Sequence, residues 1–147
     1  MKEIIIFDFN RTLYDPDADK LISGAKFVLR ILCRRGFSLY LISRAGKSRR
    51  ALIRSLGIEH YFSRVIVAKE KSKKDFKRIV ASKTVDRHSS FVVGDRVRKE
   101  IRIGNELGLQ TIWLCAGKFA GERPVKKIEQ PIHTARSLRD VLRIIRR

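Results

Sequence analysis

Five apolar runs alternate with segments of helical periodicity, and this alternation limits the fold more than any other feature of the sequence. The runs lie at residues 3–9, 37–43, 64–68, 89–95 and 110–116. Their apolar residues are largely continuous, as in strands that are buried on both faces. The helical patterns lie at residues 23–35, 47–57, 72–83 and 98–108, with a final one from about residue 137. This order predicts a three-layer α/β/α, Rossmann-like domain with a central, mostly parallel sheet of five or more strands.

The length of the chain is typical of one domain, and no linker-like segment divides it. We therefore expect residues 1–147 to form a single domain. No apolar run approaches the ~20 residues of a membrane-spanning helix, and the first nine residues do not resemble a signal peptide. These observations predict a cytoplasmic protein with no membrane partner. The sequence does not indicate an oligomeric state.

The chain carries an unusual excess of positive charge. It has 34 Lys and Arg against 15 Asp and Glu, a net charge of +19, and residues 44–83 alone have a net charge of +10. A field of this sign attracts polyanions, so nucleic acid or a ribonucleoprotein is a candidate partner. The alternative is thermal adaptation through ion-pair networks, although such networks need acidic partners that this chain has in short supply.

Polar residues follow the apolar runs at the positions where parallel strands would end. They are Asp8, Ser43, a lysine-rich segment at 69–74, and Asp95. In parallel α/β folds the carboxyl ends of the strands meet at one crevice. Two carboxylates there can hold Mg²⁺, while a lysine and a hydroxyl can bind a phosphate group. An aspartate beside them can attack phosphorus, so the pattern predicts phosphoryl transfer.

These positions resemble the motifs of the haloacid dehalogenase (HAD)-like hydrolases, and the resemblance covers nearly the whole chain. The first motif stands here as "IIIFDFNRTL" and the second as "LYLIS". The lysine motif corresponds to "KEKSKKDF". The last motif corresponds to "FVVGDRVRKEIRIGNELGLQTIWL". All four occur in the family's order, so the resemblance implies the HAD-like version of the predicted fold and a hydrolase or phosphatase activity.

The resemblance also implies roles for individual residues. Asp8 would be the nucleophile and a Mg²⁺ ligand. The main-chain carbonyl of Asn10 and the carboxylate of Asp95 would be further ligands. Glu100 would orient the metal's water molecules or the site lysine, which is best matched by Lys71.

Other residues would bind the phosphoryl group of a phosphorylated substrate. Thr12, Ser43 and the adjacent Arg44 are expected to contact it, and Lys71 would neutralise its charge. The sequence leaves three register alternatives to Lys71, namely Lys69, Lys73 and Lys74.

Asn10 departs from the pattern of the family's phosphatases, which have an aspartate there that protonates the leaving oxygen and then activates water. An amide cannot exchange a proton near neutral pH, and general acid–base catalysis typically contributes ~10²–10⁴-fold. Arg11 is a second departure, since small residues are common there. Its guanidinium would either clamp substrate phosphate or point to solvent.

Three functions are compatible with these residues. The first is a Mg²⁺-dependent phosphohydrolase of reduced or specialised activity that forms an aspartyl-phosphate. The second is a catalytically weakened relative whose basic surface binds RNA or a ribonucleoprotein. The third is a dehalogenase-type hydrolase, which lacks support because no segment corresponds to that class's apolar cap.

The spacing of the motifs also predicts an open site. Only 35 positions separate Asp8 from Ser43, and 28 separate Ser43 from Lys71. The predicted strands and helices fill both intervals, so no large cap domain fits. An open crevice beside a basic segment favours a bulky or polyanionic substrate. His60, His88 and His133 lie far apart without metal-ligand spacing, and we expect structural or surface roles for them.

Overall fold

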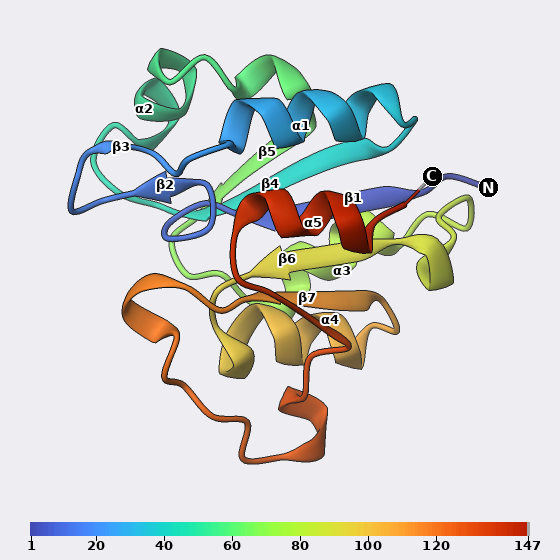
Figure 1. The fold of residues 1–147 in the computed structure, drawn as a ribbon. Coiled ribbons are helices and arrows are strands. Elements are labelled where there is room, and N and C mark those ends of the chain that lie inside the picture. The colour runs from blue at the N-terminus through green and yellow to red at the C-terminus, as the bar shows by residue number, and fades with distance from the viewer. Residues whose placement is uncertain (147) are drawn as a thin grey trace.

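A parallel six-stranded sheet forms the centre of the computed structural model, which describes residues 1–146 (Figure 1). In spatial order its strands are β5 (Phe62–Ala68), β4 (Ser38–Arg44), β1 (Ile4–Asp8), β6 (Phe91–Gly94), β7 (Gln110–Leu114) and β8 (His133–Ala135). The order reverses direction on either side of β1, so the crevice of this sheet lies at the carboxyl ends of β1 and its neighbours.

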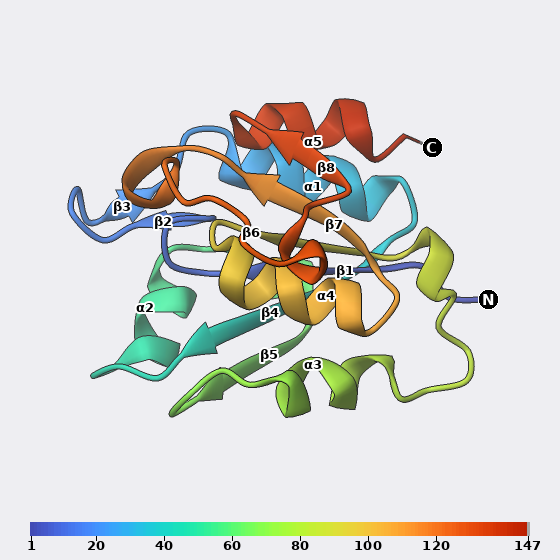
Figure 2. The same cartoon turned by 90° about the horizontal axis from the view of Figure 1, so that it is seen from below.

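Helices cover both faces of the sheet, as the view in Figure 2 shows. One face carries α1 (Ala25–Arg34), α2 (Arg49–Ser55) and α5 (Leu138–Ile144). The other carries α3 (Lys73–Val80) and α4 (Arg102–Glu106). The predicted three-layer α/β/α fold class is therefore confirmed.

Each helix buries the face that its sequence periodicity predicts. In α1 the buried residues are Ala25, Val28, Leu29 and Leu32, which recur at the spacing of one helical face. The central strand β1 is buried along its whole length, including Asp8. A continuous apolar strand that ends in a buried carboxylate places that carboxylate next to the core, where it needs polar partners.

Some elements differ from the sequence-based expectation. The strand β8 was not predicted because it has only three residues and no apolar run. The same holds for the two-residue strands of a hairpin, β2 (Tyr14–Asp15) and β3 (Lys20–Leu21). The helix predicted at 98–108 begins one residue earlier with a π-helical turn at Val97–Ile101, and α4 continues from that turn.

The two intervals where a cap could be inserted are short. Between β1 and β4 the chain forms the β2–β3 hairpin and α1. Between β4 and Lys71 it forms α2, a 3₁₀ turn at Glu59–Tyr61 and β5. Neither interval contains a further domain, so the crevice at the strand ends has no lid of several helices from these parts of the chain. Among the described residues, no helix has the length and apolar character needed to cross a bilayer.

One edge of the sheet is formed by β5, and its outer side is basic. Ser63 and Arg64 of this strand are exposed. Arg50 of α2 donates a hydrogen bond to the main-chain carbonyl of Val65 at 3.4 Å. A guanidinium therefore occupies one of the acceptors that a sheet edge presents.

Candidate active site

The register of the sheet brings the predicted strand-end residues together. Asp8 pairs with Ile42 of β4, so Ser43 lies one residue beyond the carboxylate on the neighbouring strand. On the other side Phe7 pairs with Val93 of β6, which places Asp95 just past the end of that strand. Three polar groups from distant parts of the sequence thus meet where the carboxyl ends of these parallel strands lie side by side.

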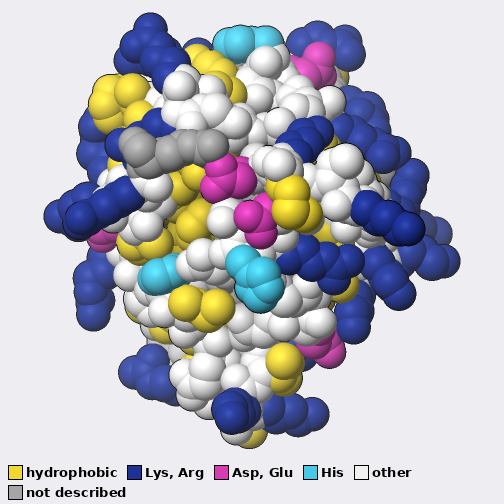
Figure 3. Space-filling model, turned by 90° about the vertical axis from the view of Figure 1, so that its right-hand side faces the viewer, with side chains coloured by type: hydrophobic (Ala, Val, Ile, Leu, Met, Phe, Trp, Pro, Cys, Tyr) yellow, Lys and Arg dark blue, Asp and Glu magenta, His cyan; other side chains and the backbone are white. Residues whose placement is uncertain are grey.

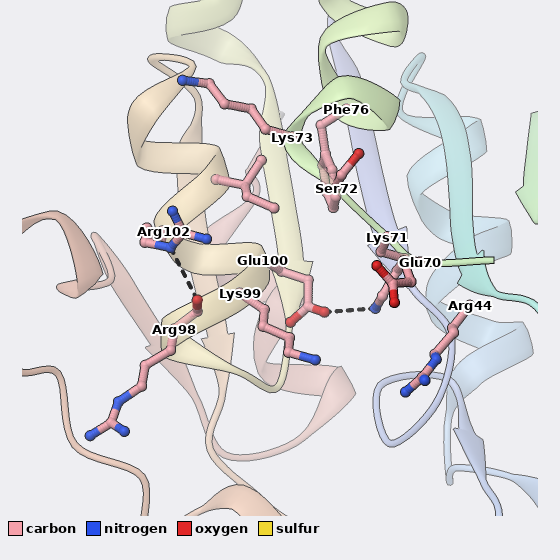
Figure 4. Close-up of a pocket in the computed structure, with 11 residues that line it drawn as sticks. Arg44, Glu70, Lys71, Ser72, Lys73, Phe76, Arg98, Lys99, Glu100 and Arg102 are labelled. Carbon is pink, nitrogen blue, oxygen red and sulfur yellow. Dashed lines mark hydrogen bonds and ion pairs between the residues drawn. The ribbon is translucent and has the colours of Figure 1, made fainter. Parts of the chain in front are cut away.

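Lys71 connects two of the predicted acidic residues. Its Nζ forms ion pairs with Oδ1 of Asp8 and with Oε1 of Glu100, the latter at 2.7 Å (Figure 4). Lys71 immediately precedes the N-cap of α3, where Ser72 and Asp75 form a capping box that fixes the start of the helix. The three alternatives Lys69, Lys73 and Lys74 are exposed, and none forms an ion pair with another described residue.

The carboxylates of Asp8, Asp95 and Glu100 are close enough to share a cation. One oxygen from each lies within 4.8 Å of the others, and all three residues are buried. Oε2 of Glu100 is buried and has no hydrogen-bond partner. A buried carboxylate oxygen without a donor is costly, and a hard divalent cation would satisfy it. The donor set therefore fits Mg²⁺.

Gly94 allows Glu100 to reach this cluster. A Cβ at position 94 would lie 2.7 Å from Cβ and 2.9 Å from Cγ of Glu100, closer than side chains pack. The π-helical turn at Val97–Ile101 directs Glu100 back toward β6 across this glycine. π-Helical turns occur often at functional sites, where they re-aim a side chain.

Burial and mutual repulsion shift the ionisation of the cluster. Burial, with a contribution from Asp95, raises the pKa of Asp8 to about 6. Burial and the neighbouring Glu100 raise the pKa of Asp95 to about 6. Burial and Asp8 also raise the pKa of Glu100. Burial acts to lower the pKa of Lys71, but Asp8 and Glu100 outweigh it and raise that pKa above its usual value, so Lys71 stays charged.

The predicted phosphate-binding residues occupy different positions around Asp8. Thr12 is buried, and its Oγ1 donates to Oδ2 of Asp8 at 3.3 Å. Ser43 is buried at the end of β4, but its Oγ donates to the carbonyl of Arg44 at 3.0 Å. The Arg44 side chain is exposed, lines a pocket next to Lys71, and does not contact the carboxylates. Lys71 and Thr12 therefore fix both oxygens of Asp8.

Asn10 makes a contact that the sequence did not suggest. Its Oδ1 accepts a hydrogen bond from Nη1 of Arg49 at 3.3 Å, and the Arg49 guanidinium lies over the Phe9 ring, 5.0 Å from its centroid. Nε of Arg49 is buried and has no hydrogen-bond partner. Arg49 is one of many arginines in a basic segment, and no local pattern distinguishes it, so sequence reasoning missed it.

The remaining predicted positions lie away from the cluster. Arg11 forms an ion pair with Asp17 at 3.1 Å, which favours the outward orientation over the phosphate clamp. None of His60, His88 and His133 belongs to the carboxylate cluster that could hold a metal. His133 instead contacts Oε1 of Gln110 at 3.0 Å, a structural role within the β7–β8 edge.

Part of the chain matches the model of a known protein family. The model of a family described as HAD-hydrolase-like matches residues 70–141, which include Lys71, Asp95 and Glu100. Among proteins of assigned function, glyceraldehyde 3-phosphate phosphatase from Pyrococcus abyssi is 29% identical over 103 residues. The match covers 66% of this chain but spans only 43% of the length of that relative.

Solved structures share the fold at low sequence identity. YfnB of Bacillus subtilis, described as a HAD-hydrolase and solved bound to magnesium, superposes with a TM-score of 0.81 at 14% identity, covering 98% of each chain. A HAD-superfamily hydrolase from Ehrlichia chaffeensis gives 0.72 at 16% identity, covering 99% of this chain and 97% of the other. A 2-haloacid dehalogenase from Pseudomonas syringae gives 0.73 at 14% identity, covering 96% of each. The fold is thus common to enzymes with different reactions.

Proposed function

We propose that this chain is a haloacid dehalogenase-like hydrolase, and that it acts as a Mg²⁺-dependent phosphohydrolase that forms an aspartyl-phosphate on Asp8. One observation carries the proposal: Lys71 contacts both Asp8 and Glu100, and the carboxylate of Asp95 lies within 4.8 Å of theirs. A candidate nucleophile, the Lys71 ammonium group and two further carboxylates lie together at the carboxyl ends of the strands. This arrangement suits phosphoryl transfer better than a purely structural role.

In the first step a carboxylate oxygen of Asp8 attacks phosphorus, and the bond from phosphorus to the leaving oxygen breaks. The leaving oxygen keeps the bonding electron pair. Lys71 and the Thr12 hydroxyl hold the Asp8 carboxylate in place before the attack. Lys71 also balances negative charge on the transferring group, because its raised pKa keeps it protonated at neutral pH.

The protons of the reaction must be handled without the usual aspartate. The Asn10 amide cannot protonate the leaving oxygen, and its Oδ1 already accepts a hydrogen bond from Arg49. The leaving oxygen would therefore take its proton from water. In the second step water attacks the phosphorus of the aspartyl-phosphate, inorganic phosphate leaves, and the Asp8 carboxylate is restored. Slow turnover is the expected consequence.

Asp8, Asp95 and Glu100 would hold the metal ion, with the carbonyl of Asn10 as a further ligand. Bound Mg²⁺ supplies positive charge that lowers repulsion between the Asp8 carboxylate and an anionic phosphate. Lys71 shares this task, and the unpartnered oxygen of Glu100 supports the presence of a cation.

The substrate is proposed to be a bulky or polyanionic phosphate compound. The crevice lacks an inserted lid between β1 and Lys71, and the segment 44–83 beside it has a net charge of +10. The name of the Pyrococcus abyssi relative, a glyceraldehyde 3-phosphate phosphatase, supports a phosphorylated substrate in general.

The decisive experiment compares the natural protein with Asp8→Asn. We expect the natural protein to hydrolyse an aryl phosphate when Mg²⁺ is present, and Asp8→Asn to be inactive. Acid quenching during turnover should trap a phosphoryl group whose bond to the protein is cleaved by hydroxylamine, as an acyl phosphate is. Equal activity of the two proteins would contradict the proposal.

A second candidate function is a catalytically weakened relative that binds RNA or a ribonucleoprotein. Asn10 and the net charge of +19 favour it. Figure 3 shows the side of the molecule that carries both termini, and many Lys and Arg side chains lie around the periphery of this view. The positive charge is therefore not confined to the site. This function predicts that affinity for a short RNA falls steeply between low and moderate salt. A flat salt response would argue against it.

A further inference from the structure

A pocket of about 530 Å³ opens beside the carboxylate cluster (Figure 4). Lys71 and Glu100 form part of its wall, so it is continuous with the proposed site of phosphoryl transfer. The N-terminal part of α3 and the turn at Val97–Ile101 form its sides, while Phe76 and Ile103 add apolar surface. A pocket of this volume can accept a group the size of a nucleotide.

Positive charge dominates the lining of this pocket. Its basic residues are Arg44, Lys71, Lys73, Arg98, Lys99 and Arg102, against only two carboxylates, those of Glu70 and Glu100. Lys71 is already paired with Asp8 and Glu100, and Arg102 is paired with Glu106 at 3.4 Å. In contrast, the side chains of Arg44, Lys73 and Lys99 form no ion pair or hydrogen bond with any described residue.

The directions of these side chains separate them into two groups. In Figure 4 the ends of Lys99 and Arg44 extend past the Lys71–Glu100 pair from its two sides. The ends of Lys73 and Arg98 point away from that pair. Lys99 and Arg44 therefore flank the place where a substrate bound at the carboxylate cluster would extend into the pocket.

We propose that Arg44 and Lys99 form a subsite for a second phosphate group of the substrate, next to the one that is transferred. The proposal rests on the proposed function, and it narrows the substrate class to compounds with two or more phosphates. Lys71 is already neutralised by two carboxylates, so it contributes little to binding a second anion. Arg44 and Lys99 offer free positive charge, and a guanidinium can bind phosphate through two parallel hydrogen bonds.

The test compares two substrates on three proteins. The substrates are a nucleoside 3′,5′-bisphosphate and the matched 5′-monophosphate, and the readout is the ratio of their kcat/KM values. The proteins are the natural chain, the variant Arg44→Gln/Lys99→Gln, and the control Lys26→Gln/Arg34→Gln. The control removes one lysine and one arginine from exposed positions on α1, on the opposite face of the sheet, and so lowers the net charge equally.

We expect the natural protein and the control to prefer the bisphosphate, and the preference to fall at least ~5-fold in Arg44→Gln/Lys99→Gln, as for the loss of two partly exposed charge contacts. An unchanged ratio in that variant would overturn the subsite. An equal fall in the control would also overturn it, because the preference would then come from the overall charge.

A binding measurement separates failure of the subsite from failure of the proposed function. Calorimetry with Asp8→Asn and the bisphosphate requires no turnover. Suppose that the natural protein is inactive, but that Asp8→Asn binds the bisphosphate more tightly than the monophosphate. If adding Arg44→Gln/Lys99→Gln to Asp8→Asn abolishes this preference, the proposed hydrolysis fails and the subsite stands. If the natural protein is active on both substrates without preference, the subsite fails and the hydrolysis stands.

The substrate that carries the second phosphate can be a small metabolite or the end of a nucleic acid. A short oligonucleotide with a 5′-phosphate presents the same neighbouring phosphate chemistry. A higher kcat/KM for the oligonucleotide than for the bisphosphate, lost in Arg44→Gln/Lys99→Gln, would support the subsite and identify a nucleic-acid end. The reverse order with the same loss would support it for a small bisphosphate.

Discussion

Nη1 of Arg49 donates a hydrogen bond to Oδ1 of Asn10 at 3.3 Å, so a guanidinium faces the residue two positions beyond Asp8. This contact decides what an acid at position 10 could do. In Asn10→Asp the new carboxylate would face Arg49, whose charge would lower its pKa and keep it ionised. An ionised carboxylate cannot protonate a leaving oxygen.

We therefore expect Asn10→Asp alone to raise kcat on an alkyl phosphate by less than ~10-fold, and Asn10→Asp/Arg49→Met to raise it by ~10²-fold or more. Steady-state kinetics with Mg²⁺ measure both, and Arg49→Met alone is the control that introduces no acid. Equal gains in the single and double variants would show that Arg49 does not govern ionisation at position 10.

Removing the positive charge of Lys71 from the carboxylate cluster should lower the stability of the protein. Lys71 is largely buried between Asp8 and Glu100. In Lys71→Met these carboxylates lose their partner, so the metal-free protein should lose ~3–5 kcal/mol of unfolding free energy at a pH of about 8. Excess Mg²⁺ should restore part of this loss by replacing the missing charge.

The matched control for that variant is Lys73→Met, because Lys73 is exposed and unpaired. Its free energy of unfolding should change by no more than ~0.5 kcal/mol. Urea denaturation of both variants, with and without Mg²⁺, checks the prediction. Similar losses in the two variants would mean that Lys71 is not the lysine that stabilises the cluster.

Gly94→Ala should disturb the proposed metal site without replacing any of its charged residues. The added Cβ would lie 2.7 Å from Cβ of Glu100, so the turn carrying Glu100 must move. We expect a loss of ~1–3 kcal/mol in stability and a weaker rise in melting temperature on adding Mg²⁺. Gly121→Ala is the control, since a Cβ there meets no atom within 4 Å. A normal Mg²⁺ response in Gly94→Ala would contradict the proposed role of this glycine.

The ionisation of the cluster predicts a pH dependence of stability. Burial raises the pKa values of Asp8 and Asp95 from 3.8 to about 6. Without metal, the native state keeps protons at about pH 5 that the unfolded chain has released. The stability from these protons is complete below the ordinary pKa and is lost as the pH rises through about 6.

Asp95→Asn removes one of the titrating groups. In a chelator, its unfolding free energy relative to the natural protein should therefore increase between about pH 5 and about pH 7.5. For the natural protein, Mg²⁺ should raise the melting temperature more at the higher pH, because the metal requires ionised carboxylates. Denaturation curves at the two pH values measure both effects. A stability difference that does not change with pH would contradict the assigned ionisation.

The sequence predicts most of the sheet because its central strands are largely apolar. The strands β1, β4, β6 and β7 coincide with largely apolar runs, since both faces of the sheet are covered there. The edge strand β5 was found from its run at 64–68, although only Ile66 of this strand is buried. β8 escapes prediction because only Ala135 of its three residues is buried, and its position depends on pairing with β7. Pairing of this kind is a tertiary effect that local pattern does not encode.

Some residues of the candidate site can also be identified from the sequence, and others cannot. Asp8 and Asp95 follow from strand ends, because parallel strands bring their carboxyl ends to one edge. Lys71 was ambiguous among four lysines, yet the Ser72–Asp75 capping box could have placed the helix start directly after it. Arg49 and Lys99 could not be identified, because their roles depend on which way a surface side chain points in the folded protein.

The basic edge of the sheet has a consequence for the behaviour of the protein in concentrated solution. An open strand such as β5 presents main-chain groups on which a second copy could add, the first stage of aggregation. Arg64 projects beside this strand, and the Arg50 guanidinium covers the carbonyl of Val65. Two such edges approaching each other would bring like charges together. We therefore expect Arg50 and Arg64 to oppose edge-to-edge association, and added salt to weaken that protection by screening the repulsion.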